Sequence, residues 1–187
     1  MHPRTQELLQ HLDAQRATLR DAVDAVPADL RDRKPAPERW SVAEILEHLA
    51  LVESRLAQFF SSQVAEARGN GLGAESDTSS VLAKTRTGVV LDRRRRIMAA
   101  EFILPTGTLD TRAALAELER TRGVFREAIL ASDGLAIGEV TRPHPVLGPL
   151  DLYEWLAFTG YHEARHAAQI QELASELTSE VADRDGQ

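Results

Sequence analysis

The chain has 187 residues, a length that suits one domain, and 43% of them are hydrophobic, which is enough for a core. It has no cysteine, which excludes disulfides, thiolate metal ligands and a cysteine nucleophile, so any metal site must use His, Asp or Glu. The formal net charge of −7 argues against general nucleic-acid binding, because phosphates would be repelled.

The ends and the hydropathy of the chain point to a cytoplasmic protein. The first ten residues, MHPRTQELLQ, lack the apolar segment of a signal peptide. No stretch approaches the roughly eighteen uninterrupted apolar residues of a membrane-spanning helix. We therefore expect neither a membrane partner nor a nucleic-acid partner.

The first half of the chain predicts two amphipathic helices. The first covers 5–26, where apolar residues recur every three or four positions, and Pro27 ends it. A loop rich in proline and charge follows over 27–40. The second helix begins after Ser41, which forms a capping box with Glu44, and continues to about residue 67, before the glycines of 69–73.

The second half predicts two more long helices. Residues 74–109 are the least regular, and their pattern allows a short helix around 78–90. The third long helix covers 110–131, and the fourth begins after the cap Asp151 and ends near Leu177. No segment shows the alternation of a strand. The economical architecture is an all-α, single-domain four-helix bundle over 1–177 with a polar tail over 178–187.

The lengths of the connections bear on the topology of this bundle. They are about 15, 40 and 20 residues long in turn. The long middle connection leaves room for a crossover.

Two histidines mark one face of the fourth helix. His162 and His166 are four residues apart, which places their side chains on the same face, roughly 5–6 Å apart at Cβ. They share that face with Trp155 and Leu173, so we expect them to point into the bundle. Both imidazoles can then bind one ion.

A third histidine shares this character. His48 lies on the apolar stripe of the second helix, three residues after Ile45 and four before Val52. A single histidine on such a stripe is usually a hydrogen-bonded core residue. Three on the inner faces of two helices are better explained by one divalent cation, which satisfies all three and keeps coordination positions open. Zn²⁺, Ni²⁺ and Fe²⁺ all suit this ligand set. We assign no role to His2, in the terminal segment, or to His11, which we expect to point sideways or outward.

The letters HEARH at 162–166 also match the H-E-x-x-H pattern of zinc proteases. The continuation AAQIQE departs from the metzincin pattern, with Gln169 in place of glycine and Glu172 in place of the third histidine. Strands that would bind a peptide are not predicted either. Glu163 then either flanks the metal or points to solvent, and a zinc protease is the least favoured function.

Two segments carry a family resemblance. They are ERWSVAEILEHLALVE (38–53) and HPVLGPLDLYEWLAFTGYHEARHAAQI (144–170). Both resemble motifs of the DinB-like (DinB/YfiT) metalloproteins, in particular the DinB_2 branch. The first looks like W-S-x-x-E-x-x-x-H-L, and the second like G-x-L-x-x-x-E-W-L followed by H-x-x-x-H-x-x-Q-I. The matching residues are Trp40, Ser41, Glu44, His48, Leu49, Gly148, Leu150, Glu154, Trp155, Leu156, His162, His166, Gln169 and Ile170.

The resemblance implies a four-helix bundle with a long crossover, usually a homodimer, and a divalent metal on His48, His162 and His166. Relatives include transferases and an isomerase that use a low-molecular-weight thiol, proteins labelled as metal-dependent hydrolases, and stress-induced proteins. A metal-dependent thiol transferase or hydrolase acting on a small molecule is therefore the favoured function. The alternative is a non-enzymatic metal- or ligand-binding bundle of the stress response.

Three other features carry weaker hypotheses. The basic run Arg93–Arg96 would bind the carboxylates of a thiol, or else form a solvated loop. His144 would donate a proton near the mouth of the site, or else belong to a rigid turn with Pro145 and Pro149 before the fourth helix. Gln169 would support His166 from outside the metal ligands, or else be a polar residue at a helix interface.

Overall fold

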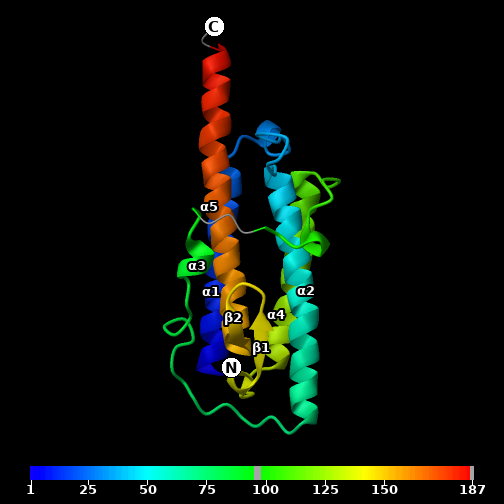
Figure 1. The fold of residues 1–187 in the computed structure, drawn as a ribbon, viewed down its shortest axis with the longest axis vertical. Helices are drawn as coiled ribbons and strands as arrows, with labels where there is room; N and C mark the ends of the chain where they lie inside the picture. Colours follow the sequence, from blue (N-terminus) through cyan, green and yellow to red (C-terminus); the bar gives the residue numbers. More distant parts are fainter. Residues whose placement is uncertain (95–97, 186–187) are drawn as a thin grey trace.

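The computed structural model describes residues 1–94 and 98–185, with side chains as far as residue 179. Its long elements are the helices α1 (Pro3–Asp24), α2 (Val42–Gly69), α4 (Thr111–Ala131) and α5 (Leu152–Asp185) (Figure 1). The short elements are the helix α3 (Gly88–Leu91), the strands β1 (Thr141–His144) and β2 (Gly148–Asp151), and 3-10 turns at Ala28–Leu30, Glu101–Ile103 and Ile137–Glu139. The predicted all-α bundle of four long helices is confirmed.

The helices pack as two parallel pairs. Near one end, apolar residues late in α1 meet residues late in α5, and residues early in α2 meet residues early in α4. Near the other end, the start of α1 meets the start of α5, and the ends of α2 and α4 meet. The order is thus up, down, down, up, and residues 70–110 form the crossover that joins the parallel helices α2 and α4 (Figure 1).

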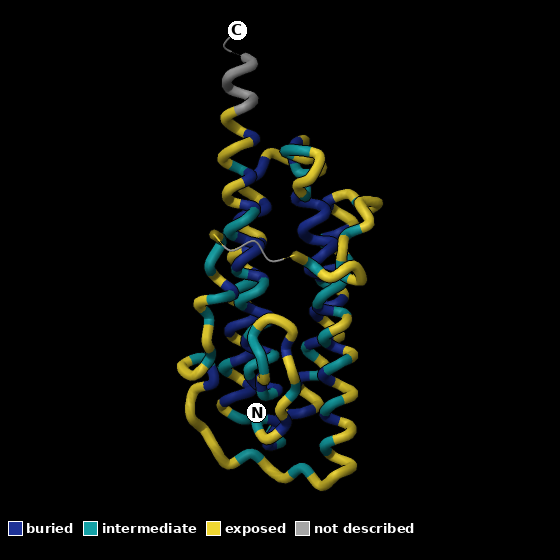
Figure 2. Tube along the Cα trace, in the orientation of Figure 1, coloured by how far each residue is buried: buried dark blue, intermediate teal, exposed yellow. Residues whose placement is uncertain are grey.

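The core consists of the inward faces of these helices. Leu19, Ile45, Leu118 and Ile170 are at most 1% exposed in the first cluster. Figure 2 shows buried residues along the inner sides of the helices and exposed residues along much of the crossover. The period of apolar residues in the sequence therefore identified the faces that pack.

The predicted helix caps are present. The Ser41 hydroxyl accepts a hydrogen bond from the Glu44 backbone N–H, and the Glu44 carboxylate accepts one from the Ser41 N–H. Asp151 and Glu154 make the same reciprocal pair at the start of α5. These bonds satisfy N–H groups that have no partner within the helix, and they fix where each helix starts.

The expectation of no strand is wrong at one place. β1 and β2 form an antiparallel hairpin in which Pro143 faces Pro149, and Gly148 closes the turn at φ +79°. Proline in a short segment reads as a loop, because it cannot donate to a ladder. Alternate pairs of an antiparallel ladder exchange no hydrogen bonds, and two facing prolines fit such a pair.

Two helix boundaries also differ from the sequence pattern. The segment around 78–90 contains only the single turn α3, and the rest of it is irregular. α5 continues to Asp185, beyond its expected end near Leu177, and residues 186–187 of the predicted tail lie outside the described residues. Polar residues such as Glu and Ser continue a helix readily once several turns are anchored on a core.

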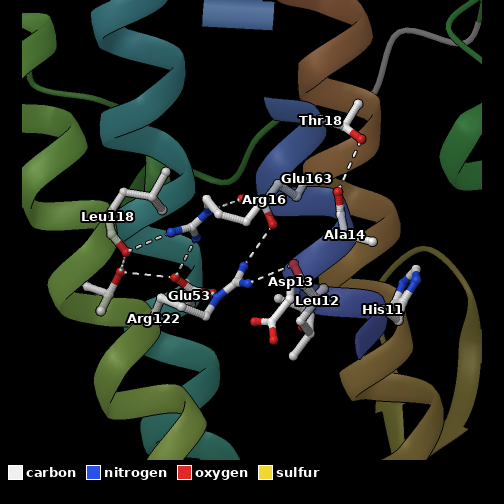
Figure 3. Close-up of polar contacts among 12 residues, drawn as sticks. His11, Leu12, Asp13, Ala14, Arg16, Thr18, Glu53, Leu118, Arg122 and Glu163 are labelled. Carbon is white, nitrogen blue, oxygen red and sulfur yellow. Dashed lines mark hydrogen bonds and ion pairs between the residues drawn. The ribbon is translucent and has the colours of Figure 1, made fainter. Parts of the chain in front are cut away.

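A cluster of four buried charges, which we call the ionic node, joins all four long helices (Figure 3). It comprises one residue from each helix: Arg16, Glu53, Arg122 and Glu163. Each arginine bridges both glutamates, and Figure 3 shows the side chains meeting between the helices. The Arg122–Glu163 contact is 2.7 Å and the Arg16–Glu53 contact is 3.2 Å.

The surroundings of the node complete its hydrogen bonds. Arg122 also donates to the Leu12 carbonyl, and the Thr121 hydroxyl donates to Glu53. Glu53 and Glu163 are only 3% and 2% exposed. A buried charge of this kind is tolerated only when it is paired and fully hydrogen-bonded, so the node fixes the register of the four helices relative to one another.

Glu53→Ala should strongly destabilise the protein. The change leaves the guanidinium groups of Arg16 and Arg122 without one shared carboxylate, so that they share Glu163, with Glu119 as the other partner of Arg16. Removal of one partner from a buried ion pair typically costs about 3–5 kcal/mol. Urea unfolding followed by circular dichroism measures the change in the free energy of unfolding.

The matched control is Glu117→Ala, since Glu117 pairs with Arg120 on the exposed surface of α4. We expect it to change stability by no more than about 0.5 kcal/mol. Equal effects of the two substitutions would show that the node does not contribute as described.

Candidate metal centre

His48 is held on the inner face of α2 and is 2% exposed. Its Nδ1 lies 2.7 Å from the carbonyl oxygen of Ile103, in the crossover. A carbonyl only accepts, so Nδ1 carries the proton and Nε2 keeps its lone pair free. The Trp40 ring, just before the helix cap, packs against the imidazole at a centroid distance of 4.9 Å.

His162 and His166 lie on successive turns of α5, as the spacing predicts. Their Nε2 atoms are 3.2 Å apart. His166 donates from Nδ1 to the side-chain oxygen of Gln169 at 2.9 Å, so its Nε2 is also free to bind. Of the two hypotheses for Gln169, the structure agrees with the one in which its side chain supports His166 without being a metal ligand itself.

The fold brings all three predicted histidines together. The centroid of the His48 ring lies 5.4 Å from that of His162 and 5.0 Å from that of His166. One ligand nitrogen from each lies within 4.8 Å of the others. The cluster therefore spans the boundary between α2 and α5, which come from opposite halves of the sequence.

Burial keeps these imidazoles neutral. It lowers the pKa of His48, although the bond to the Ile103 carbonyl opposes the shift. It lowers the pKa of His162 to about 3 and that of His166 well below the usual value, and repulsion among the histidines adds to both shifts. Neutral imidazole is the form that binds a metal, so the cluster is ready to bind at neutral pH.

The separation of the two histidines on α5 fits one ion. Two ligands placed about 2.1 Å from a tetrahedral ion lie about 3.4 Å apart. The separation of 3.2 Å between His162 Nε2 and His166 Nε2 is close to that value. His162 is the partly exposed member of the three, whereas His48 and His166 are buried.

Glu163 points neither to the metal site nor to solvent, and both expectations for it are wrong. Its two carboxylate oxygens are bound by Arg16 and Arg122 in the ionic node. A zinc protease needs this glutamate free to activate water. The H-E-x-x-H match therefore combines two metal-binding candidates with a structural carboxylate.

The structure also places two histidines outside the cluster, and one of them, His11, differs from its expected position. His11 is buried, not outward: its Nε2 is 3.2 Å from the Ala157 carbonyl, and it packs on Gly160, where a Cβ would lie 2.3 Å from that nitrogen. His144 ends β1, and its Nδ1 accepts hydrogen bonds from the N–H groups of Val146 and Leu147 at 3.1 Å. This places His144 in a rigid turn, which is a hairpin.

The basic run is partly neutralised by ion pairs. Arg93 binds Glu172 at 2.6 Å, and Arg94 binds Asp92 at 3.0 Å. Arg95 and Arg96, the other members of the predicted anion site, lie outside the described residues.

Sequence reasoning missed two contributors to the centre. The Ile103 carbonyl is a backbone group in an irregular segment, 55 residues after His48, and no pattern of side chains marks it. The Phe158 ring stacks on His162 with centroids 5.7 Å apart and planes at 23°. Phe158 lies four residues before His162, and that spacing was the available signal.

The fold and the site define a helical-bundle protein with a three-histidine candidate metal centre. Comparison with known proteins agrees: the DinB_2 model of the DinB superfamily matches residues 11–170, and the chain belongs to that superfamily. It is similar to the uncharacterized protein YuaE of Bacillus subtilis (strain 168), with 26% identity over 149 residues, which cover 78% of this chain and 84% of YuaE.

Two further comparisons gave negative findings. No solved structure shows a significant match to the chain. Within the described residues, no helix has the length and apolar character needed to cross a membrane.

Gln169→Leu should weaken metal binding. It removes the acceptor that orients His166, and loss of such a partner typically costs about 10–100-fold in metal affinity. Competition with a chromophoric chelator measures the dissociation constant for Zn²⁺. Gln171→Leu, on the exposed side of the same helix, is the matched control and should leave the constant unchanged. Equal constants for the two variants would contradict the role given to Gln169.

The metal-free protein should lose stability on mild acidification. His162 has a pKa of about 3 when folded and 6.5 as its ordinary value, so the unfolded chain binds more protons between these values. Stability then falls as the pH drops below about 6.5. Urea midpoints from about pH 7.5 to about pH 5 would show this decline, and His162→Gln should make it shallower. An identical pH dependence in the variant would refute this explanation.

Proposed function

We propose that the chain is a metal-dependent enzyme that holds one divalent ion, Zn²⁺, Ni²⁺ or Fe²⁺, through His48, His162 and His166. The observation that carries the proposal is the convergence of three imidazoles, each of which offers one nitrogen within 4.8 Å of the others. Three protein ligands are the number found in catalytic zinc sites, which keep further positions for water or substrate. The partial exposure of His162 supports access to those positions.

The substrate in this proposal is a small molecule, and the reaction is transfer of a low-molecular-weight thiol or hydrolysis. An ion bound there would lower the pKa of a bound thiol or water and so supply a nucleophile near neutral pH. The residues of the chain hold the ligands in place: Ile103 orients His48, Gln169 orients His166, and Phe158 packs on His162.

Membership of the DinB superfamily supports three further proposals. The chain would form a homodimer, act in the cytoplasm and take part in a stress response.

His48→Ala should abolish stoichiometric metal binding. Mass spectrometry of metals on the untagged wild type should give about one equivalent of a divalent transition ion, because catalytic zinc sites use three protein ligands. Since α5 alone supplies two ligands, the variant should retain little. His2→Ala, outside the cluster, should bind like the wild type. Full metal content in His48→Ala would contradict a site shared between α2 and α5.

Thiol coordination distinguishes the two reactions. In the Co²⁺-loaded protein, an added low-molecular-weight thiol should produce a thiolate-to-cobalt charge-transfer band if the chain is a thiol transferase. Hydrolysis of activated esters without that band would favour the hydrolase. Neither signal across broad substrate panels would leave a metal-binding bundle without catalytic activity.

A further inference from the structure

A cavity of about 130 Å³ lies outside the metal centre, on the outer face of α5. Two parts of the sequence enclose it: the crossover around α3, and the continuous segment that runs from the turn of the β-hairpin into the first turns of α5. Figure 1 shows α3 and the hairpin beside α5, and both contact it. The hydrogen bonds that orient His48 and His166 use none of the residues that line this cavity, whereas Phe158, which stacks on His162, forms part of its wall.

The walls of the cavity are mainly apolar. They are formed by Val89, Val90, Val146, Leu147, Leu150 and Phe158. An engineered apolar cavity of about 150 Å³ binds benzene. The size and lining therefore fit an aromatic ring or a branched aliphatic group of similar size.

The walls are held in place by polar contacts. Arg165 donates to the carbonyls of Val90 and Asp92, at 2.9 and 2.8 Å, which ties the crossover wall to α5. His144 accepts the two N–H groups of the hairpin turn, at Val146 and Leu147. Both walls are thus fixed without a ligand, so the cavity is preformed.

The rim adds a charge preference. Glu154 lines the cavity, but its carboxylate caps α5 by accepting the Asp151 N–H at 3.0 Å. Arg86 also lines it, is exposed, and forms no ion pair with any described residue. A free guanidinium at the rim of an apolar cavity favours a carboxylate on the occupant.

Phe158 connects this cavity with the metal centre. Its side chain lines the cavity, and its ring stacks on His162. We propose that the cavity binds the aromatic or branched aliphatic body of a small carboxylate that is the substrate of the metal centre. The identity of the occupant as substrate rests on the proposed function, whereas binding itself does not.

Benzoate is the probe, with benzyl alcohol as its neutral counterpart, and calorimetry measures both in metal-free and zinc-loaded protein. Benzoate should bind in both forms and more tightly than benzyl alcohol. Leu147→Trp, whose larger side chain fills the cavity, should weaken the affinity for benzoate at least about tenfold. Val124→Trp, on the exposed surface of α4, should not. Val89→Trp tests the opposite wall, so the result does not depend on one variant folding.

Arg86→Gln tests the charge preference. The substitution should weaken the affinity for benzoate about two- to fivefold, as expected for the loss of one exposed ion pair, and leave the affinity for benzyl alcohol unchanged. If Leu147→Trp, Val89→Trp and the wild type bound benzoate with equal affinity, the proposal that benzoate binds in this cavity would be overturned. Benzoate binding that requires zinc would overturn it too, because the carboxylate would then be a metal ligand. Benzoate binding in a protein that takes up none of Zn²⁺, Ni²⁺ and Fe²⁺ would support the cavity and contradict the proposed function.

Discussion

The ionic node is the constraint on which the arrangement of the bundle depends. Four buried charges, one from each long helix, satisfy one another only when all four helices are in register. Apolar faces alone would tolerate small shifts of one helix along another, whereas a displaced guanidinium would leave a buried carboxylate unpaired. Because Glu163 is the neighbour of His162, the contacts that fix the node also fix the height of the metal ligands on α5.

The candidate metal centre uses that register. His48 reaches the other two histidines only if α2 and α5 are aligned, and Glu53 on α2 meets Glu163 on α5 through the shared arginines. The centre is then refined by contacts of its own, from the Ile103 carbonyl to His48 and from Gln169 to His166. Three kinds of contact thus position the metal ligands with increasing precision. Apolar packing brings the helices together, the buried charges set their register, and the local hydrogen bonds set the direction of the imidazole nitrogens.

The sequence predicts the features that depend on local pattern, namely the face of a helix that repeats along the chain and the residues that mark where a helix begins or ends. The apolar stripes locate the long helices, Ser41 and Asp151 mark two of their starts, and the spacing of His48, His162 and His166 places them on inner faces. Prediction from the sequence fails for residues whose contacting partners come from distant segments of the chain. Glu163 looks like a catalytic or solvated residue until Arg16 and Arg122 are seen beside it, and His11 looks exposed until Gly160 leaves room for its ring. The hairpin is missed because its facing prolines resemble a loop.

The central claim is that α2 and α5 together hold one ion through three imidazoles. X-ray absorption spectroscopy of the Co²⁺-loaded protein counts them directly. The account predicts three histidine nitrogens at about 2.0–2.1 Å, counted from the multiple scattering of their imidazole rings, with the remaining shell completed by an oxygen or nitrogen ligand that is not an imidazole. A shell with two imidazoles or fewer, or one that includes a carboxylate from Glu163, would contradict it.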